Sequence, residues 1–201
     1  SGRYPTATMR DNNGTLWFGC NDGSVFYSRG QKLEQVTLPN SSSTGISAIL
    51  HSADGRILIV SQRQPLYSVD PDKPSEVSTI TFRDDPGIFS AGITPSGGFL
   101  FGTQENLLIC RLAGDSITTV TRVEGFDYAR ITAIQPLGET KDFIIGTDGN
   151  GLFRLNPEGT SPVLARFAEF PALGSISVRS VVRDSKNNIW ITTSGEGVFR
   201  M

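Results

Sequence analysis

The stretch Asp11-Asn12-Asn13-Gly14-Thr15-Leu16-Trp17-Phe18-Gly19-Cys20 is repeated near the other end of the chain as Asp184-Ser185-Lys186-Asn187-Asn188-Ile189-Trp190-Ile191-Thr192-Thr193. The two segments align without a gap, and three weaker copies lie between them at 54–61, 96–103 and 141–147. The position of Gly19 is filled in the five copies, at intervals of 41, 42, 44 and 46 residues, by Gly19, Val60, Gly102, Gly146 and Thr192. A near-constant period in the low forties indicates a repeat architecture.

Each copy predicts four short β-strands joined by tight turns. The first strand is apolar, and two positions after its first apolar residue it carries a small one, at Ala7, Ala48, Ser90, Ala133 and Ser180. Asp-Gly and Asn-Gly steps mark the hairpins, and no stretch shows a sustained helical period. Small side chains suit inner strands that crowd around an axis. The pattern therefore predicts an all-β fold, a β-propeller of about five four-stranded blades without a helix longer than two turns, in which Trp17 and Trp190 pack between blades.

The predicted blades divide a single domain, residues 1–201, into repeats at about 4–42, 43–84, 85–125, 126–173 and 174–201. The last repeat stops after its third strand, at 198–201, so we expect an incomplete last blade with an unpaired edge. The five residues before the first strand span at most about 18 Å, too little to supply the missing strand. We therefore expect a fragment of a larger propeller, an open arc or a strained five-blade ring, prone to self-association.

Composition excludes several classes of protein. The chain has 201 residues and a net charge of −2, so no basic field attracts nucleic acid or anionic lipid. No apolar run approaches the roughly twenty residues of a membrane span. The single histidine, His51, excludes a His-rich zinc site and catalysis by a histidine pair. We expect no cofactor, no metal site, no nucleic-acid partner and no membrane segment in this chain.

The two cysteines are expected to be free thiols. Cys20 should end the second strand of the first repeat, and Cys110 should lie in the third strand of the third repeat. A whole blade would then separate them, whereas a disulfide needs Cα atoms within about 7 Å.

The pattern Asp-x-x-Gly-x-Leu/Ile-Trp-Phe/Ile-Gly/Thr, followed by a turn and Gly-x-Val/Leu-Phe, resembles the two-component regulator propeller repeat. Residues 11–27 and 184–200 carry the pattern, and residues 148–154 carry its second half. The resemblance implies the periplasmic sensor region of a hybrid histidine kinase of the Bacteroidetes type. In that family such repeats form seven-bladed propellers that detect oligosaccharides, and the rest of the larger receptor chain, with its kinase, would be a partner of this segment.

Two alternatives to this resemblance fit the residues less well. The Asp-box of sialidase-like propellers, Ser-x-Asp-x-Gly-x-Thr-Trp, differs in spacing, because Gly14 follows Asp11 by three residues and Trp17 follows Gly14 by three. A glycosidase needs two carboxyl groups that face each other. The carboxylates on suitable loops, most of them in turns where Asp bonds the local backbone, are Asp84, Asp85, Asp127, Asp148 and Glu196. We therefore expect this chain not to be an enzyme.

A ligand of a propeller generally meets the loops that lead into the inner strands, here 40–45, 83–89, 124–130 and 170–177. Aromatic rings can stack on the apolar faces of sugars, and arginine and aspartate can bond their hydroxyl groups. The ligand-binding candidates are Arg83, Asp85, Phe126, Tyr128, Arg130, Phe170 and Arg179. For each aromatic, the alternative is that it plugs its loop against the blade.

Two classes of function stay open. The first is a ligand-binding sensor propeller, the extracytoplasmic part of a two-component signalling receptor that recognises an oligosaccharide. The alternative is a non-catalytic propeller scaffold for protein–protein interaction. A carbohydrate-active enzyme is a distant third.

Overall fold

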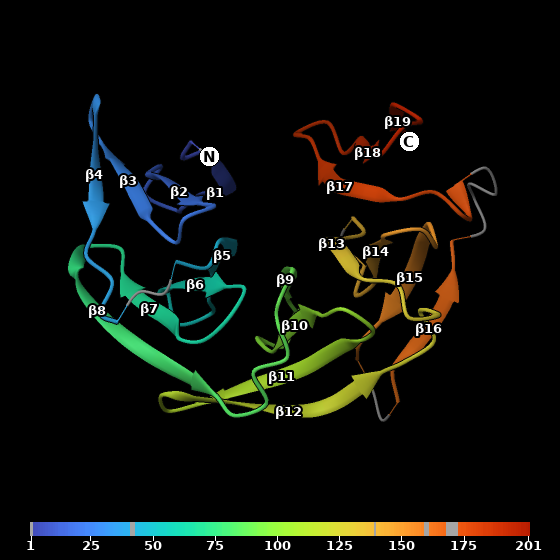
Figure 1. The fold of residues 1–201 in the computed structure, drawn as a ribbon, viewed down its shortest axis with the longest axis horizontal. Helices are drawn as coiled ribbons and strands as arrows, with labels where there is room; N and C mark the ends of the chain where they lie inside the picture. Colours follow the sequence, from blue (N-terminus) through green and yellow to red (C-terminus); the bar gives the residue numbers. More distant parts are fainter. Residues whose placement is uncertain (1, 41–42, 139, 159–160, 168–172) are drawn as a thin grey trace. The chain divides into compact units, whose positions relative to one another are not determined.

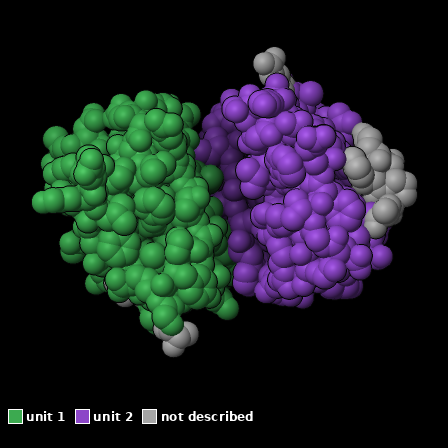
Figure 2. All heavy atoms as spheres, turned by 90° about the horizontal axis from the view of Figure 1, so that it is seen from above, with its two compact units in different colours: residues 1–88, 111–118 green, residues 89–110, 119–201 purple. Residues whose placement is uncertain are grey.

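The computed structural model describes residues 2–40, 43–138, 140–158, 161–167 and 173–201. The chain divides into two compact units, residues 1–88 with 111–118 (unit 1) and residues 89–110 with 119–201 (unit 2), which Figure 2 colours green and purple. The described residues form β-strands and no α-helix, so the predicted all-β fold is confirmed.

The strands recur in the predicted order (Figure 1). The first strands of the repeats are β1 (Pro5–Arg10), β5 (Ile46–His51), β9 (Ser90–Ile93), β13 (Ile131–Pro136) and β17 (Val178–Arg183). The second strands are β2 (Leu16–Cys20), β6 (Ile57–Ser61), β10 (Phe99–Gly102), β14 (Phe143–Thr147) and β18 (Ile189–Thr193). The third strands are β3 (Val25–Arg29), β7 (Leu66–Asp70), β11 (Leu107–Ala113), β15 (Leu152–Asn156) and β19 (Val198–Arg200). The fourth strands are β4 (Lys32–Val36), β8 (Lys73–Phe82), β12 (Ser116–Val123) and β16 (Val163–Arg166).

Consecutive strands pair antiparallel, as expected for the blades of a propeller. Unit 1 contains the orders β1-β2-β3-β4 and β5-β6-β7-β8, and unit 2 contains β13-β14-β15-β16 and β17-β18-β19. Within unit 1, Ser116 and Ile117 also lie parallel to Thr81 and Phe82 at the end of β8. The last sheet has three strands among the described residues, and β19 lies at its edge, as the strand count predicts.

The small residue of the second strand allows the next repeat to approach. A Cβ atom added to Gly146 would lie 2.7 Å from Cγ1 of Val178, the first residue of the following inner strand. Gly102 has the same relation to Ile131, and Gly19 to Ile46. The recurring glycine is therefore a packing requirement between neighbouring repeats, which is the physical reason for part of the sequence period.

The spacing of aspartate and tryptophan in the motif has a local cause. One carboxylate oxygen of Asp11 accepts hydrogen bonds from the backbone N–H groups of Asn13 and Thr15, both at 2.9 Å. The other accepts the indole N–H of Trp17 at 2.9 Å. Asp184 makes the same bond to the indole of Trp190, also at 2.9 Å. Each aspartate therefore closes its turn and fixes the ring on the next strand.

The two tryptophans differ in burial. Trp17 is fully buried and stacks on Tyr27, with ring centroids 5.4 Å apart, as its predicted core position requires. Trp190 is 39% exposed, and the guanidinium of Arg200 lies over its ring. This corrects the expectation that both rings are packed between blades.

Candidate functional site

The residues predicted to contact a ligand fall in both units. Unit 1 holds Arg83 and Asp85. Unit 2 holds Phe126, Tyr128, Arg130 and Arg179. Phe170 lies outside the described residues.

Unit 2 contains a hollow of about 280 Å³ between the turn from β10 to β11 and the loop from β12 to β13. Its lining is polar and acidic apart from two aromatic residues, and consists of Glu105, Asn106, Glu124, Gly125, Phe126, Asp127 and Tyr128. The hollow lies at one of the loops that the sequence analysis selected, and it combines an aromatic ring with carboxylate and amide groups.

Tyr128 is the exposed aromatic residue of this hollow. Its exposed fraction is 82%, and its backbone lies in the left-handed region at φ 62°, next to Asp127 at φ 52°. A bulky residue in this region is an outlier that costs about 1–3 kcal/mol and persists only where the surroundings impose it. Such strain around an exposed ring is typical of binding sites.

Contacts from the neighbouring strands hold this strained loop in place. Asn150, in the turn between β14 and β15, donates from its side-chain amide to the backbone carbonyl of Phe126 at 3.0 Å. Arg166 at the end of β16 donates to the carboxylate of Asp127 at 3.0 Å. Within the loop, the backbone N–H of Ala129 donates to the carbonyl of Phe126. The backbone on either side of Tyr128 is therefore held in place by the chain itself.

Phe126 has a different role from the one predicted. It is fully buried and packs edge-on against Phe153, with ring centroids 5.1 Å apart. Its ring belongs to the core of unit 2, with Phe143 and Leu155 among its neighbours in that cluster. Phe126 closes the floor under the loop and offers no exposed face for stacking, which corrects the expectation of a ligand contact there.

The predicted arginines of unit 2 gather around one carboxylate. Arg130 forms an ion pair with Asp148 at 2.7 Å, and its guanidinium lies over the ring of Phe89. A hydrogen bond from Ser177 lowers the pKa of Asp148, and the charges of Arg130 and Arg179 contribute to the same shift, which burial opposes. Arg179 donates to the hydroxyl of Ser194 at 3.1 Å. The arrangement keeps Asp148 ionised between two cations.

Arg83 and Asp85 are both exposed on unit 1. The carboxylate of Asp85 accepts a hydrogen bond from the backbone N–H of Gln64 at 3.2 Å, and Asp85 has a positive φ of 35°. The side-chain oxygen of Gln64 in turn accepts from the backbone N–H of Phe82 at 2.9 Å. Asp85 thus ties its loop to the turn between β6 and β7.

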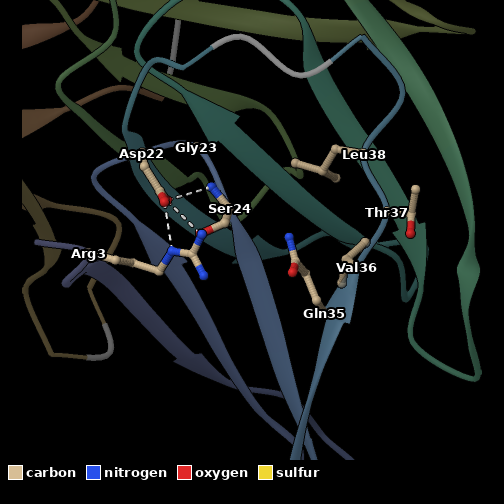
Figure 3. A pocket seen from close by; sticks show the side chains of 8 residues that line it. All are labelled: Arg3, Asp22, Gly23, Ser24, Gln35, Val36, Thr37 and Leu38. Carbon is tan, nitrogen blue, oxygen red and sulfur yellow. Dashed lines mark hydrogen bonds and ion pairs between the residues drawn. The ribbon is translucent and has the colours of Figure 1, made fainter.

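Unit 1 contains a second hollow, of about 460 Å³, that the sequence analysis missed (Figure 3). It is lined by Arg3, Asp22, Gly23, Ser24, Gln35, Val36, Thr37 and Leu38. Its lining comes from the segment before β1, the turn between β2 and β3, and the end of β4. These segments are separated in the sequence and share no motif. They come together only when the strands pair in the sheet, so the sequence alone does not indicate the hollow.

The cysteines, possible metal sites and possible membrane spans are further features that bear on function. Cys20 and Cys110 are both buried, and they lie in β2 and β11 as predicted. Among the described residues, no group of three or more His, Cys, Asp or Glu side chains is placed to hold a metal ion. No helix in the described ranges is long and apolar enough to cross a membrane.

The fold and one repeat match known proteins. Residues 172–195 match the family model described as "Two component regulator propeller". No curated protein sequence matches the chain. Among solved structures, one match is named as the extracellular domain of a hybrid two component system, BT3049 of B. thetaiotaomicron. It has 19% identity and a TM-score of 0.71, over 100% of this chain and 27% of that one. The domain of BT4673, from the same organism, has 18% identity and a TM-score of 0.67, over 96% and 26%.

Propellers of other functions match as well. The virginiamycin B lyase of Staphylococcus aureus has 13% identity and a TM-score of 0.70, over 98% of this chain and 69% of the lyase. At these identities the matches show the fold, and the chain spans about a quarter of the two-component domains, 26% and 27% of their lengths. The chain is therefore a β-propeller, and its last repeat carries the resemblance to the two-component regulator propeller that the sequence indicated.

Proposed function

We propose that this chain is part of a ligand-binding propeller in the extracytoplasmic region of a two-component receptor, and that the ligand is an oligosaccharide. The observation that carries the proposal is the exposed ring of Tyr128 at the edge of an acidic and amide-lined hollow. The family match of the last repeat and the two-component neighbours supply the class of receptor.

The hollow offers the groups that a sugar ring requires. The ring of Tyr128 can stack on the apolar C–H face of a sugar. Glu105 and Glu124 can accept hydrogen bonds from hydroxyl groups, and Asn106 can both donate and accept them. Because Asn150 and Arg166 already hold the loop, little conformational entropy is lost when a ligand binds.

The proposal assigns binding to this lining. Its carboxylates Glu105 and Glu124 are assigned to hydrogen bonds with sugar hydroxyl groups. Periplasmic placement and the connection to a kinase are part of the same proposal. The neighbours that are named as extracellular domains of two-component systems support an extracytoplasmic place.

A glycan array followed by titration calorimetry tests the proposal. We expect at least one neutral oligosaccharide to bind, and Tyr128→Ala to weaken it about tenfold or more, which corresponds to about 1.4 kcal/mol. Tyr4→Ala is the matched control, because Tyr4 is an exposed tyrosine of unit 1 that does not line this hollow. Absence of any glycan ligand would contradict the proposal and favour the scaffold function. Equal effects of the two tyrosine variants would refute the assignment of the site.

A further inference from the structure

The hollow of unit 1 contains an arginine that is already held in position. Nε of Arg3 donates to the carboxylate of Asp22 at 2.6 Å, and the guanidinium lies 5.5 Å from the centroid of the Phe26 ring. The segment before β1 is tied to the same turn, because the backbone N–H of Tyr4 donates to the side chain of Asn21 at 2.8 Å. The guanidinium group of Arg3 is therefore held at its Nε edge by Asp22 and on one face by the ring of Phe26.

Both carboxylate oxygens of Asp22 accept hydrogen bonds from the protein. One of its oxygens accepts from the backbone N–H of Ser24 at 3.1 Å and from the hydroxyl of Ser24, and the other accepts from Arg3. The hydrogen bond from the Ser24 hydroxyl, followed by the bond from Arg3, lowers the pKa of Asp22 to about 2. Among the described residues, the two terminal nitrogens of Arg3 have no hydrogen-bond partner. The cationic donors of the hollow that are free to bind a ligand are therefore the terminal nitrogens of Arg3.

The fourth repeat shows how the same fold uses an arginine in this setting. Phe26 follows Val25, which pairs with Gly19, and Phe153 follows Leu152, which pairs with Gly146, so the two rings occupy equivalent positions. Arg166 lies over the ring of Phe153 at 5.0 Å. Its terminal nitrogens bind the carboxylate of Asp127 and the backbone carbonyls of Asn150 and Gly174. There the chain itself supplies oxygen partners for the terminal nitrogens, whereas those of Arg3 have none among the described residues.

We propose that the hollow of unit 1 is a second ligand site, in which the terminal nitrogens of Arg3 bind the carboxylate of a hydroxylated small molecule, the chemistry of a uronic acid. Two parallel N–H groups on a rigid plane match a carboxylate in geometry and charge. A volume of about 460 Å³ suits a small ligand. Its lining residues all belong to unit 1 and include none of those that line the hollow at Tyr128.

The other lining groups account for the hydroxylated part of the ligand. Figure 3 shows Arg3, Asp22 and Ser24 together on one side of the hollow, with Gln35 and Thr37 on the other. An amide and a hydroxyl can each donate and accept a hydrogen bond, as sugar hydroxyl groups require. Val36 and Leu38 supply apolar surface beside them. A plain dicarboxylate would satisfy Arg3 alone and should bind more weakly.

The test follows the Arg side-chain Nε–H signals of the ¹⁵N-labelled chain by NMR during titration with sodium D-glucuronate, D-glucose or glutarate. We expect glucuronate to shift the Arg3 signal, glucose to leave it unchanged, and glutarate to need at least several-fold higher concentration. Arg3→Gln should raise the Kd for glucuronate about tenfold or more, and Arg3→Lys should recover only part of the loss because it lacks the planar fork. Circular dichroism confirms that each variant is folded.

Arg29→Gln is the matched control. Arg29 also lies over an aromatic ring, Tyr27, and pairs with a carboxylate, Glu34, but it does not line the hollow. Equal shifts with glucose and glucuronate, or unchanged glucuronate binding in Arg3→Gln, would overturn the proposal. Glutarate binding as tightly as glucuronate would refute the sugar-acid class. Tyr128→Ala should leave glucuronate binding intact. Failure of the proposed site at Arg3 can therefore be distinguished from failure of the proposed oligosaccharide site at Tyr128.

Discussion

Replacing Gly146 by alanine would place a methyl group in the contact between two neighbouring repeats of unit 2. An ideal Cβ at this position lies 2.7 Å from Cγ1 of Val178 and 3.2 Å from Cβ of Ala133. Because carbon atoms prefer separations of about 3.5–4.0 Å, these side chains would have to move apart by roughly 1 Å. Overpacking of this kind costs about 1–3 kcal/mol, and the stiffer unfolded chain returns about 0.4–1 kcal/mol. We expect a net loss of roughly 1–2 kcal/mol.

Thermal unfolding followed by far-UV circular dichroism measures this loss. For a chain of this length, 1 kcal/mol lowers Tm by about 2–4 °C, so we expect a decrease of about 2–8 °C. Gly2→Ala is the control, because nothing lies within 4 Å of a Cβ at that position. Adding Val178→Ala to Gly146→Ala should remove the clash, so the double variant should be more stable than the sum of the single effects predicts.

Two results would refute the reasoning about the recurring glycine. One is a Gly146→Ala variant with the Tm of the parent chain. The other is strict additivity in the double variant, which would mean that Gly146 and Val178 do not press against each other. Either result would remove the close approach of neighbouring repeats as the cause of the glycine period.

Three further predictions address the loop, the motif aspartate and the thiols. Asn150→Ala should release the 124–130 loop, which would appear as faster hydrogen exchange there and weaker oligosaccharide binding; unchanged exchange would contradict its anchoring role. The hydrogen bond from the Trp190 indole, with those from Asn188, lowers the pKa of Asp184 to about 2, so its contribution to stability is present above about pH 4 and is lost as pH falls toward 2. Denaturation of Asp184→Asn should show a smaller loss over that pH window. Thiol titration of the unfolded, unreduced protein should find two free groups, whereas none would indicate a disulfide.

Much of the fold could be predicted because its signals are local. Turn residues and short apolar runs recur with the period, and the apolar runs 46–51, 131–136 and 178–183 have the same bounds as β5, β13 and β17. Where the strand bounds differ from the apolar runs, the cause is pairing between distant segments. β9 begins at Ser90, two residues after the start of the apolar run 88–94, because the backbone N–H of Ile88 donates to the carbonyl of Gln62 in the preceding repeat.

The candidate sites were less predictable because they depend on backbone direction and on distant segments. Phe126 and Tyr128 look alike in the sequence, but the left-handed backbone at Asp127 and Tyr128 leaves one ring in the core and turns the other to solvent. The hollow at Arg3 joins segments from both ends of the first repeat. No residue pattern marks it, since Arg3 precedes the first strand and Gln35 lies on the fourth.

The most direct test of the binding function is a crystal structure of this chain with an oligosaccharide selected from the array. We predict a sugar ring stacked on Tyr128, with its hydroxyl groups bonded to Glu105, Asn106 or Glu124 and with the loop in the conformation described above. A saccharide bound elsewhere on the chain, with Tyr128 free of contacts, would contradict the account.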